Sequence, residues 1–135
     1  MDLPGLLLVE DNEEDVIFFR MALRKTNCAI RLNVVATGEQ AVDYLTGCVA
    51  GRLDVPRPGA IVVDLKMRGM DGFELIEWIH SRSDWQKTPI IVLSSSGLRQ
   101  DMERARDLGA SAFFVKPSAP LELVEIVRQI KAFVE

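Results

Sequence analysis

Apolar residues along the chain gather in short runs that alternate with longer stretches of helical period. Five runs of aliphatic and β-branched side chains predict strands at Leu6–Val9, Leu32–Val35, Ile61–Val63, Ile90–Leu93 and Ala112–Val115. Strands that are apolar throughout, and that are separated by helical stretches, are typical of a parallel sheet with helices on both faces. We therefore expect an α/β fold, a doubly wound sandwich built from five βα units.

Two stretches show the clearest helical period, Glu14–Lys25 and Gly72–Ser81. Their apolar stripes, which we expect in the core, are Val16, Phe19 and Leu23 in the first and Phe73, Ile76 and Ile79 in the second. A third stretch, Thr46–Ala60, is rich in Gly and Pro and has no period, so it predicts a surface loop.

Composition limits the classes of protein that fit. The 135 residues predict a single domain over residues 1–135 with no output domain, and a net charge of −4 does not favour nucleic acid as a partner. The sequence shows no basic leader and no apolar run near the ~18 residues of a membrane span, so a cytoplasmic protein is expected. Cys28 and Cys48 lack metal-binding or redox spacing and predict reduced thiols.

Polar side chains follow four of the predicted strands at their carboxyl ends. Glu10 and Asp11 follow the first strand, Asp64 the third, Ser94 the fourth and Lys116 the fifth. In an open α/β sheet the ligand site lies outside this edge, so we expect these side chains to converge.

A group of carboxylates at one edge favours a bound cation. Like charges a few ångström apart raise each other's pKa unless a cation is present, and Mg²⁺ suits two or three acids while leaving positions for phosphate oxygens. Lys116 adds positive charge and Ser94 a hydroxyl donor. A carboxylate can also act as a nucleophile and form an acyl phosphate, and Asp64 at the end of the central strand fits that role.

Four motifs in order, VEDN, VVDLKMRGMDG, LSSSG and DLGASAFFVKP, resemble the receiver domain of two-component response regulators from about Leu6 to Val134. The resemblance implies a flavodoxin-like fold with strand order 2-1-3-4-5. It implies that Asp11 ligates Mg²⁺ directly, that Glu10 does so through water, and that the backbone carbonyl of Lys66 is a further ligand. It makes Asp64 the phosphoacceptor.

The resemblance also assigns the signalling residues. Ser94 matches the hydroxyl that binds the phosphoryl group, Lys116 matches the lysine that pairs with it, and Phe113 matches the aromatic switch that turns inward when Ser94 moves. The Lys116–Pro117 peptide bond is expected to be cis by the same resemblance.

Three positions depart from the family pattern or modulate it. Arg68 stands where the family has Pro, which leaves the shape of the loop after Asp64 open. Lys66 and Ser96 occupy positions that, in the family, influence hydrolysis of the acyl phosphate. The long loop and the strand-end motifs further resemble single-domain regulators paired with bacterial phytochrome kinases.

The implied function is a stand-alone phosphoacceptor switch, not an enzyme with a released product. Its phosphoryl donor would be a sensor histidine kinase, a bacteriophytochrome among the candidates, or a histidine phosphotransfer protein. Three alternatives stay open: an aspartate-nucleophile phosphatase, which typically needs an acid where Lys66 stands, a flavin-binding module, and a receiver that signals without phosphate.

Two surface features complete the expectations. The last helix has a wider apolar arc than one sheet face needs. Leu121, Val124 or the edge formed by Ile126 and Phe133 is therefore either covered within the fold, by the fourth helix and the tail, or exposed on the monomer as a homodimer or partner surface at the fourth and fifth helices. Glu13, Glu14 and Asp15 are interpreted as the first turn of a helix, where negative charge suits the helix dipole.

Overall fold

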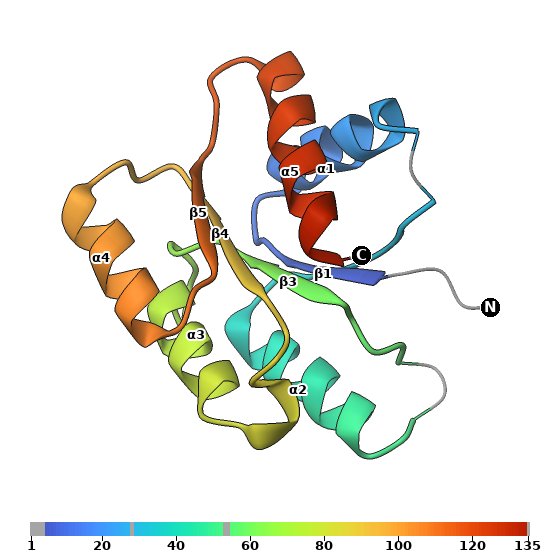
Figure 1. Cartoon of the computed structure of the whole chain (residues 1–135), viewed down its shortest axis with the longest axis vertical. Helices are drawn as coiled ribbons and strands as arrows, with labels where there is room; N and C mark the ends of the chain where they lie inside the picture. The colour runs from blue at the N-terminus through green and yellow to red at the C-terminus, as the bar shows by residue number, and fades with distance from the viewer. Residues whose placement is uncertain (1–4, 28, 53–54, 135) are drawn as a thin grey trace.

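The computed structural model describes residues 5–27, 29–52 and 55–134, and its centre is a parallel sheet of five strands in the order β2-β1-β3-β4-β5 (Figure 1). The strands are β1 (Gly5–Val9), β2 (Arg31–Val35), β3 (Ala60–Val63), β4 (Ile90–Ser94) and β5 (Ala112–Val115). The predicted doubly wound order is confirmed, and each predicted strand lies within one residue of its observed bounds.

Five α-helices cover the two faces of this sheet. They are α1 (Glu13–Lys25), α2 (Gly38–Val49), α3 (Gly72–His80), α4 (Arg99–Leu108) and α5 (Leu123–Val134), with short 3-10 helices at Ser83–Trp85 and Pro120–Glu122. Helices α1 and α5 lie on one face, and α2, α3 and α4 lie on the other (Figure 1). The molecule is thus a three-layer sandwich.

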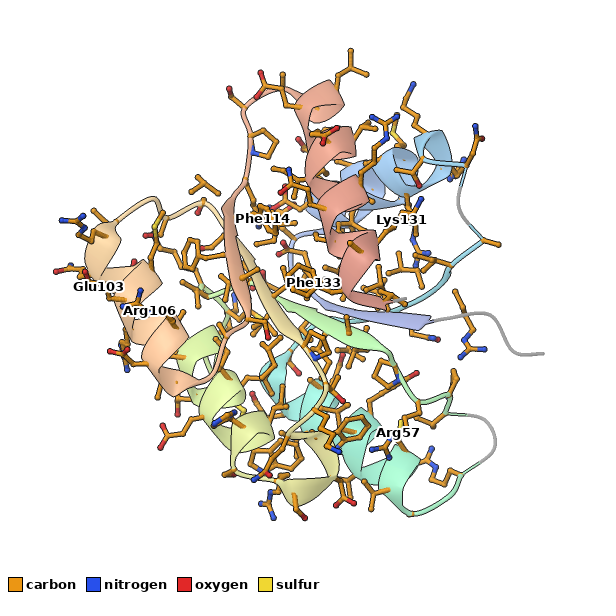
Figure 2. The ribbon with its side chains drawn as sticks, in the orientation of Figure 1. Arg57, Glu103, Arg106, Phe114, Lys131 and Phe133 are labelled. Carbon is orange, nitrogen blue, oxygen red and sulfur yellow. The ribbon has the colours of Figure 1, made fainter. Side chains whose placement is uncertain are left out.

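Successive strand residues supply the two cores in turn because side chains alternate across a strand. In β1, Leu7 and Val9 pack toward α2 and α3, whereas Leu6 and Leu8 pack toward α1 and α5. Phe114 of β5 and Phe133 of α5 also lie in the α1/α5 layer (Figure 2). Burial on both faces explains why the central strands are apolar at every position.

The helices begin and end where their capping groups allow. Asn12 caps α1 by accepting a hydrogen bond from the Asp15 backbone N–H, and Asp71 forms a capping box with Glu74 at α3. Gly109 ends α4 with a φ of 122°, as expected for its place after the last helical residue. The predicted stripes of α1 and α3 are buried, apart from Val16, which is half-buried.

Three expectations are corrected at the level of the fold. The predicted loop Thr46–Ala60 begins later, because the apolar stripe of α2 continues and the helix extends to Val49. Leu121 belongs to the 3-10 turn before α5, not to α5, because Pro120 starts that turn.

The cis bond expected at Lys116–Pro117 is wrong: no peptide bond among the described residues is cis. The trans form is favoured by about 0.5–1 kcal/mol at an X-Pro bond. The Lys116 backbone N–H donates to the Ser94 carbonyl oxygen at 2.8 Å.

Cys28 lies outside the described residues, and Cys48 is a free, half-buried cysteine.

Within the described ranges, none of the helices combines the length and the apolar character that crossing a bilayer demands.

Gly72 generates a prediction because α3 starts against the backbone that carries Asp64. A Cβ on Gly72 would collide with the Asp64 carbonyl and lie 2.5 Å from Cα of Leu65. We expect Gly72→Ala to lower the free energy of unfolding by about 1–3 kcal/mol, as overpacking of a rigid contact does. Urea denaturation measures the change.

Gly97→Ala is the matched control. A Cβ there would meet only Cγ2 of Val115, at 3.8 Å, which is ordinary contact. Its unfolding free energy should stay within about 0.5 kcal/mol of wild type. Equal losses in both variants would show that the close approach at Gly72 is not the cause.

Candidate functional site at the carboxyl edge of the sheet

The sheet itself brings the predicted residues together at its carboxyl edge. Glu10 and Asp64 directly follow β1 and β3, which are hydrogen-bonded neighbours, and the Asp64 backbone N–H donates to the Val9 carbonyl at 3.2 Å. Lys116 follows β5 in the row of Ala112 and Phe114, which faces α1 and α5. Residues more than 100 positions apart in the sequence therefore meet, since Lys116 contacts Glu10.

Three carboxylates form a compact group with the donor set of a hard divalent cation. Glu10, Asp11 and Asp64 each offer an oxygen, and these oxygens lie within 4.8 Å of one another. Glu10 and Asp64 are 4% and 6% exposed, whereas Asp11 is open to solvent. Such a set, with one exposed side, fits Mg²⁺, which prefers carboxylate oxygens and keeps several waters.

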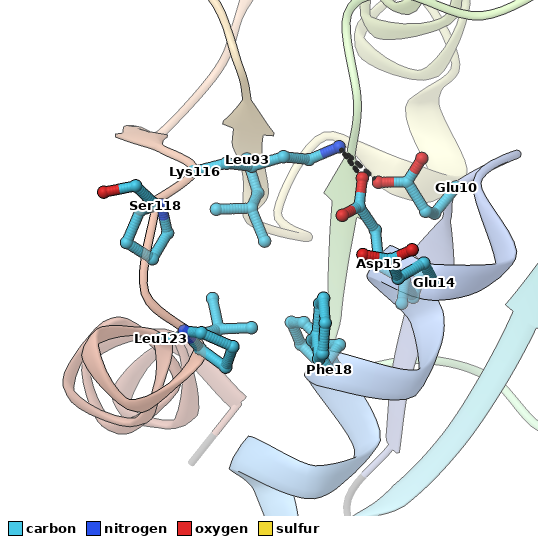
Figure 3. A pocket seen from close by; sticks show the side chains of 12 residues that line it. Glu10, Glu14, Asp15, Phe18, Leu93, Lys116, Ser118 and Leu123 are labelled. Carbon is cyan, nitrogen blue, oxygen red and sulfur yellow. Dashed lines mark hydrogen bonds and ion pairs between the residues drawn. The ribbon is translucent and has the colours of Figure 1, made fainter.

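Lys116 neutralises part of this charge through three ion pairs. Its Nζ lies 2.6 Å from Glu10 Oε1, 2.8 Å from Asp15 Oδ2 and 3.1 Å from Asp64 Oδ2. Figure 3 shows the ammonium reaching from the β5 side to Glu10 and Asp15, above a pocket of about 230 Å³ that Phe18 and Leu123 also line. An ammonium has three N–H donors, so all three are engaged.

Asp15 is the site residue that sequence reasoning missed. The sequence places it in an acidic first helical turn and predicts no further role, yet its carboxylate contacts Lys116. Helical spacing carried a usable signal, because Asp15 precedes buried Phe19 by four residues and Leu23 by eight. Extending the buried stripe of α1 by one turn toward the sheet edge places Asp15 beside the site.

Burial and charge shift two proton affinities in the site. Burial raises the pKa of Glu10 from 4.5 to about 7; the hydrogen bond from Lys116 opposes this rise, and the Asp64 charge adds to it. For Lys116, burial alone would lower the pKa, but hydrogen bonds to Asp15 and Glu10 and the charge of Asp64 outweigh it and raise the pKa above its ordinary value. Lys116 therefore remains an ammonium at physiological pH.

The two predicted switch residues lie on the other face of the sheet. Ser94 is fully buried at the end of β4, and Phe113 is half-buried and packs against the core that includes α4. Val92 pairs with Phe113, so Ser94, two residues later, extends the same face. The Ser94 hydroxyl accepts a hydrogen bond from the Ser96 backbone N–H at 3.3 Å.

Ser96 connects this strand end to α4. It is 6% exposed, and its hydroxyl donates to the Asp101 carboxylate at 2.5 Å. The loop between β4 and α4 is thus held by a side-chain bond directly beside Ser94.

The loop after Asp64, where Arg68 replaces the family's proline, is held by a contact with α2. Glu39 on α2 accepts a hydrogen bond from the Met70 backbone N–H at 3.0 Å, and Gly69 takes a φ of 72° beside that carboxylate. Lys66 is exposed, and its backbone N–H lies 3.3 Å from Asp64 Oδ1. Glu39 therefore braces the segment in which Arg68 stands.

The raised pKa of Glu10 generates a prediction for the metal-free protein. A carboxyl group with a higher pKa in the folded than in the unfolded state contributes stability below pH 4.5 that is lost as pH rises through about 7. Glu10→Gln has no group that must lose this proton. The free energy of unfolding of the variant, relative to that of wild type, should therefore rise by about 1–3 kcal/mol between pH 5 and pH 8. Urea denaturation with a chelator present at both pH values measures the difference.

Glu14→Gln is the control, because Glu14 is exposed on the first turn of α1. It should show no comparable change between the two pH values. A Glu10→Gln variant that keeps a constant offset from wild type would contradict the assignment of this pH dependence to Glu10.

Solved structures similar to this chain include phytochrome response regulators. The phosphorylated cyanobacterial phytochrome response regulator RcpA is 28% identical, with a TM-score of 0.87, over 98% of this chain and 94% of that chain. The Mn²⁺-bound form of response regulator Rcp1 is 25% identical, with a TM-score of 0.83, over 98% and 95% of the two chains. The likeness thus extends over nearly the whole of each protein.

Among curated proteins, a methanogenesis regulator is similar to this chain. It is the probable regulatory protein FilR2 of Methanothrix harundinacea, 27% identical over 95% of this chain and 81% of that protein. The chain spans as little as about half, 51%, of the length of other curated relatives that it matches.

The model of the response regulator receiver domain matches residues 6–128, which include every strand-end residue described above. The fold order and the acidic group with its lysine agree with that match. The chain belongs to the response regulator receiver domain family.

Proposed function

We propose that this chain works as a stand-alone two-component response regulator that takes a phosphoryl group on Asp64 in a Mg²⁺-dependent reaction. The observation that carries the proposal is the position of Asp64. Its carboxylate is nearly buried, shares a compact group with Glu10 and Asp11, and lies 3.1 Å from the Lys116 ammonium. Charge that develops on a transferring phosphoryl group requires positive neighbours of this kind.

The transfer step involves one bond made and one broken. An oxygen of the Asp64 carboxylate forms a bond to phosphorus while the P–N bond of a phosphohistidine donor breaks. The electron pair stays on the imidazole nitrogen, which is protonated from solvent. Mg²⁺ held by Asp11, Asp64, the Lys66 carbonyl and, through water, Glu10 would neutralise phosphoryl oxygens, while Lys116 donates to another oxygen.

Signalling would follow from movement at the strand ends. A phosphoryl group on Asp64 offers an acceptor for the Ser94 hydroxyl, which is held by the Ser96 N–H before the change. Ser94 and Phe113 extend the same face of the sheet, so a shift of Ser94 opens space for the half-buried Phe113 ring. The surface around α4 would then report the state of Asp64.

The proposed donor is a sensor histidine kinase, with a bacteriophytochrome as the preferred candidate and a histidine phosphotransfer protein as an intermediate carrier. The likeness to the phytochrome response regulator RcpA supports the link to light signalling. The setting would be the cytoplasm, and the chain would be a switch that catalyses only its own phosphorylation and dephosphorylation.

The alternatives have less support in the geometry. A Mg²⁺ phosphatase needs an acid at the second position after the nucleophile, where this chain has exposed Lys66. A flavin phosphate would face the acids Glu10 and Asp11 at the end of β1. A receiver that signals without phosphate would have no use for the complete set of acids, hydroxyl and lysine.

Pairing of two copies through α4 and α5 stays a prediction. Val124, Ile126 and Phe133 are half-buried and pack against the core, so they add little free apolar surface. Exposed apolar groups near these elements are Leu98, Val115 and Leu121, at 57%, 40% and 71% exposure, and the outer face of α4 carries Glu103 and Arg106 (Figure 2). A monomer by light scattering at tens of micromolar, with and without phosphorylation, would contradict pairing.

The phosphoacceptor assignment predicts a clear difference between wild type and Asp64→Asn. With Mg²⁺ and acetyl phosphate, wild type should gain the mass of one phosphoryl group, and the label should be removed by hydroxylamine, which attacks acyl phosphates. Asp64→Asn or a chelator should abolish the gain. Labelling that persists in Asp64→Asn would contradict the site, and sustained turnover of a phosphate ester would favour the phosphatase.

The donor assignment predicts a preference among kinases. In a phosphotransfer profile against the histidine kinases of the source organism, a phytochrome-class kinase should transfer fastest. Rapid transfer from another class, with none from phytochromes, would overturn the link to light and leave the role of Asp64 intact.

A further inference from the structure

Lys116 has more anionic partners than the proposed reaction requires. Two of its three carboxylate contacts, Glu10 and Asp64, belong to the group that fits Mg²⁺. The third contact, Asp15, does not belong to that group, which among the described residues comprises only Glu10, Asp11 and Asp64. Asp15 therefore contacts Lys116 without being a candidate metal ligand, unlike the other two acids.

The three contacts respond differently when a metal and a phosphoryl group arrive. Asp64 loses its free carboxylate on acylation, and Glu10 gains a second cationic neighbour in the metal. Asp15 lies outside the ligand group, so Lys116 remains its cation at 2.8 Å. If this contact persists in the phosphorylated state, the Asp15 carboxylate would keep one of the three ammonium donors and part of the ammonium charge.

Both ends of the Asp15–Lys116 contact are held in place. The Asp15 backbone N–H donates to the Asn12 side chain at 3.1 Å, which fixes the first turn of α1. The Lys116 backbone N–H donates to the Ser94 carbonyl at 2.8 Å, which fixes the end of β5 against β4. The pair is therefore set by the fold, and its side chains are 34% and 17% exposed, so water screens it only in part.

We propose that Asp15 is a positioning residue that competes with the phosphoryl group for the Lys116 ammonium and thereby weakens the hold on that group. The proposal rests on the function proposed for Asp64 and Lys116. Asp15 does not touch the reacting atoms; it acts by keeping the ammonium turned toward α1 (Figure 3). When the charge of Asp15 is removed, the Lys116 N–H donor that it occupies should become available to phosphoryl oxygens.

The test compares two binding constants in the full chain. Beryllofluoride with Mg²⁺ imitates the aspartyl phosphate, and Mg²⁺ alone reports the metal site, both followed by NMR titration. Asp15→Asn keeps the size of the side chain and removes its charge. We expect beryllofluoride to bind about tenfold more tightly than in wild type, and Mg²⁺ alone to bind with no gain, because Asp15 is not in the ligand group.

Two further variants separate the effect of the Asp15–Lys116 contact from the effect of the net charge of α1. Glu14→Gln removes the same charge from the same helical turn, but Glu14 makes no ion pair or hydrogen bond among the described residues, and its beryllofluoride affinity should change less than twofold. Asp15→Glu keeps the charge and should stay near wild type. The rate of aspartyl phosphate hydrolysis should fall in Asp15→Asn and stay unchanged in both of these variants.

Several outcomes would overturn the proposal. Unchanged or weaker beryllofluoride binding in Asp15→Asn would show that Asp15 does not compete for Lys116. An equal gain in Glu14→Gln would assign the effect to the net charge of α1. Asp64→Asn, measured alongside, must lose the beryllofluoride response; if it keeps the response, the phosphoacceptor site itself is wrong, which is a failure distinct from that of Asp15.

Discussion

The ammonium of Lys116 is the interaction on which the rest of the site depends. It contacts the carboxylates of Glu10, Asp15 and Asp64, and Asp11 belongs to the same compact group as Glu10 and Asp64. Burial raises the pKa of Glu10 to about 7 and the charge of Asp64 adds to this rise, whereas the hydrogen bond from Lys116 lowers it. Through these contacts Lys116 offsets part of the repulsion between the carboxylates that the strand ends bring together.

The sheet makes this arrangement possible because its strands are parallel. All strands end at one edge, so β1, β3 and β5 deliver Glu10, Asp64 and Lys116 to the same layer, facing α1. Alternation across the strands sends Ser94 and Phe113 to the opposite layer, near α4. The carboxylates and the two residues of the proposed switch thus lie on opposite faces of the sheet, and the Lys116 backbone N–H, bonded to the Ser94 carbonyl, connects the two strand ends.

The conformation of the loop after Asp64 depends both on its own residues and on a contact from a distant part of the chain. With Arg68 in place of the family's proline, the chain itself does not restrict the loop. Glu39, 31 residues earlier, accepts a hydrogen bond from the Met70 N–H, and Gly69 takes a left-handed conformation where a Cβ would lie 2.9 Å from the Glu39 carboxylate. Gly72 then lets α3 begin directly against the Asp64 backbone.

Much of the fold could be predicted from local pattern. Apolar runs bounded by turn residues located all five strands within one residue, and the signal is strongest for β1, β3 and β4, which are buried on both sheet faces. Caps such as Asp71 and Gly109 likewise act through neighbours in the sequence. The end of α2 was less predictable, since Gly47 and Cys48 suggest a loop while the packing of the helix keeps them helical.

The amino-acid sequence alone determined which residues could do chemistry: the acids after β1 and β3, the hydroxyl after β4 and the lysine after β5. The tertiary structure decided which of them share a cation. Asp15 joined the site because helix α1 packs its Phe19 face onto the sheet and carries the residue one turn earlier to Lys116, 101 positions away. Such a contact depends on how a helix is placed against a sheet, and side-chain type and spacing along the chain do not contain that placement.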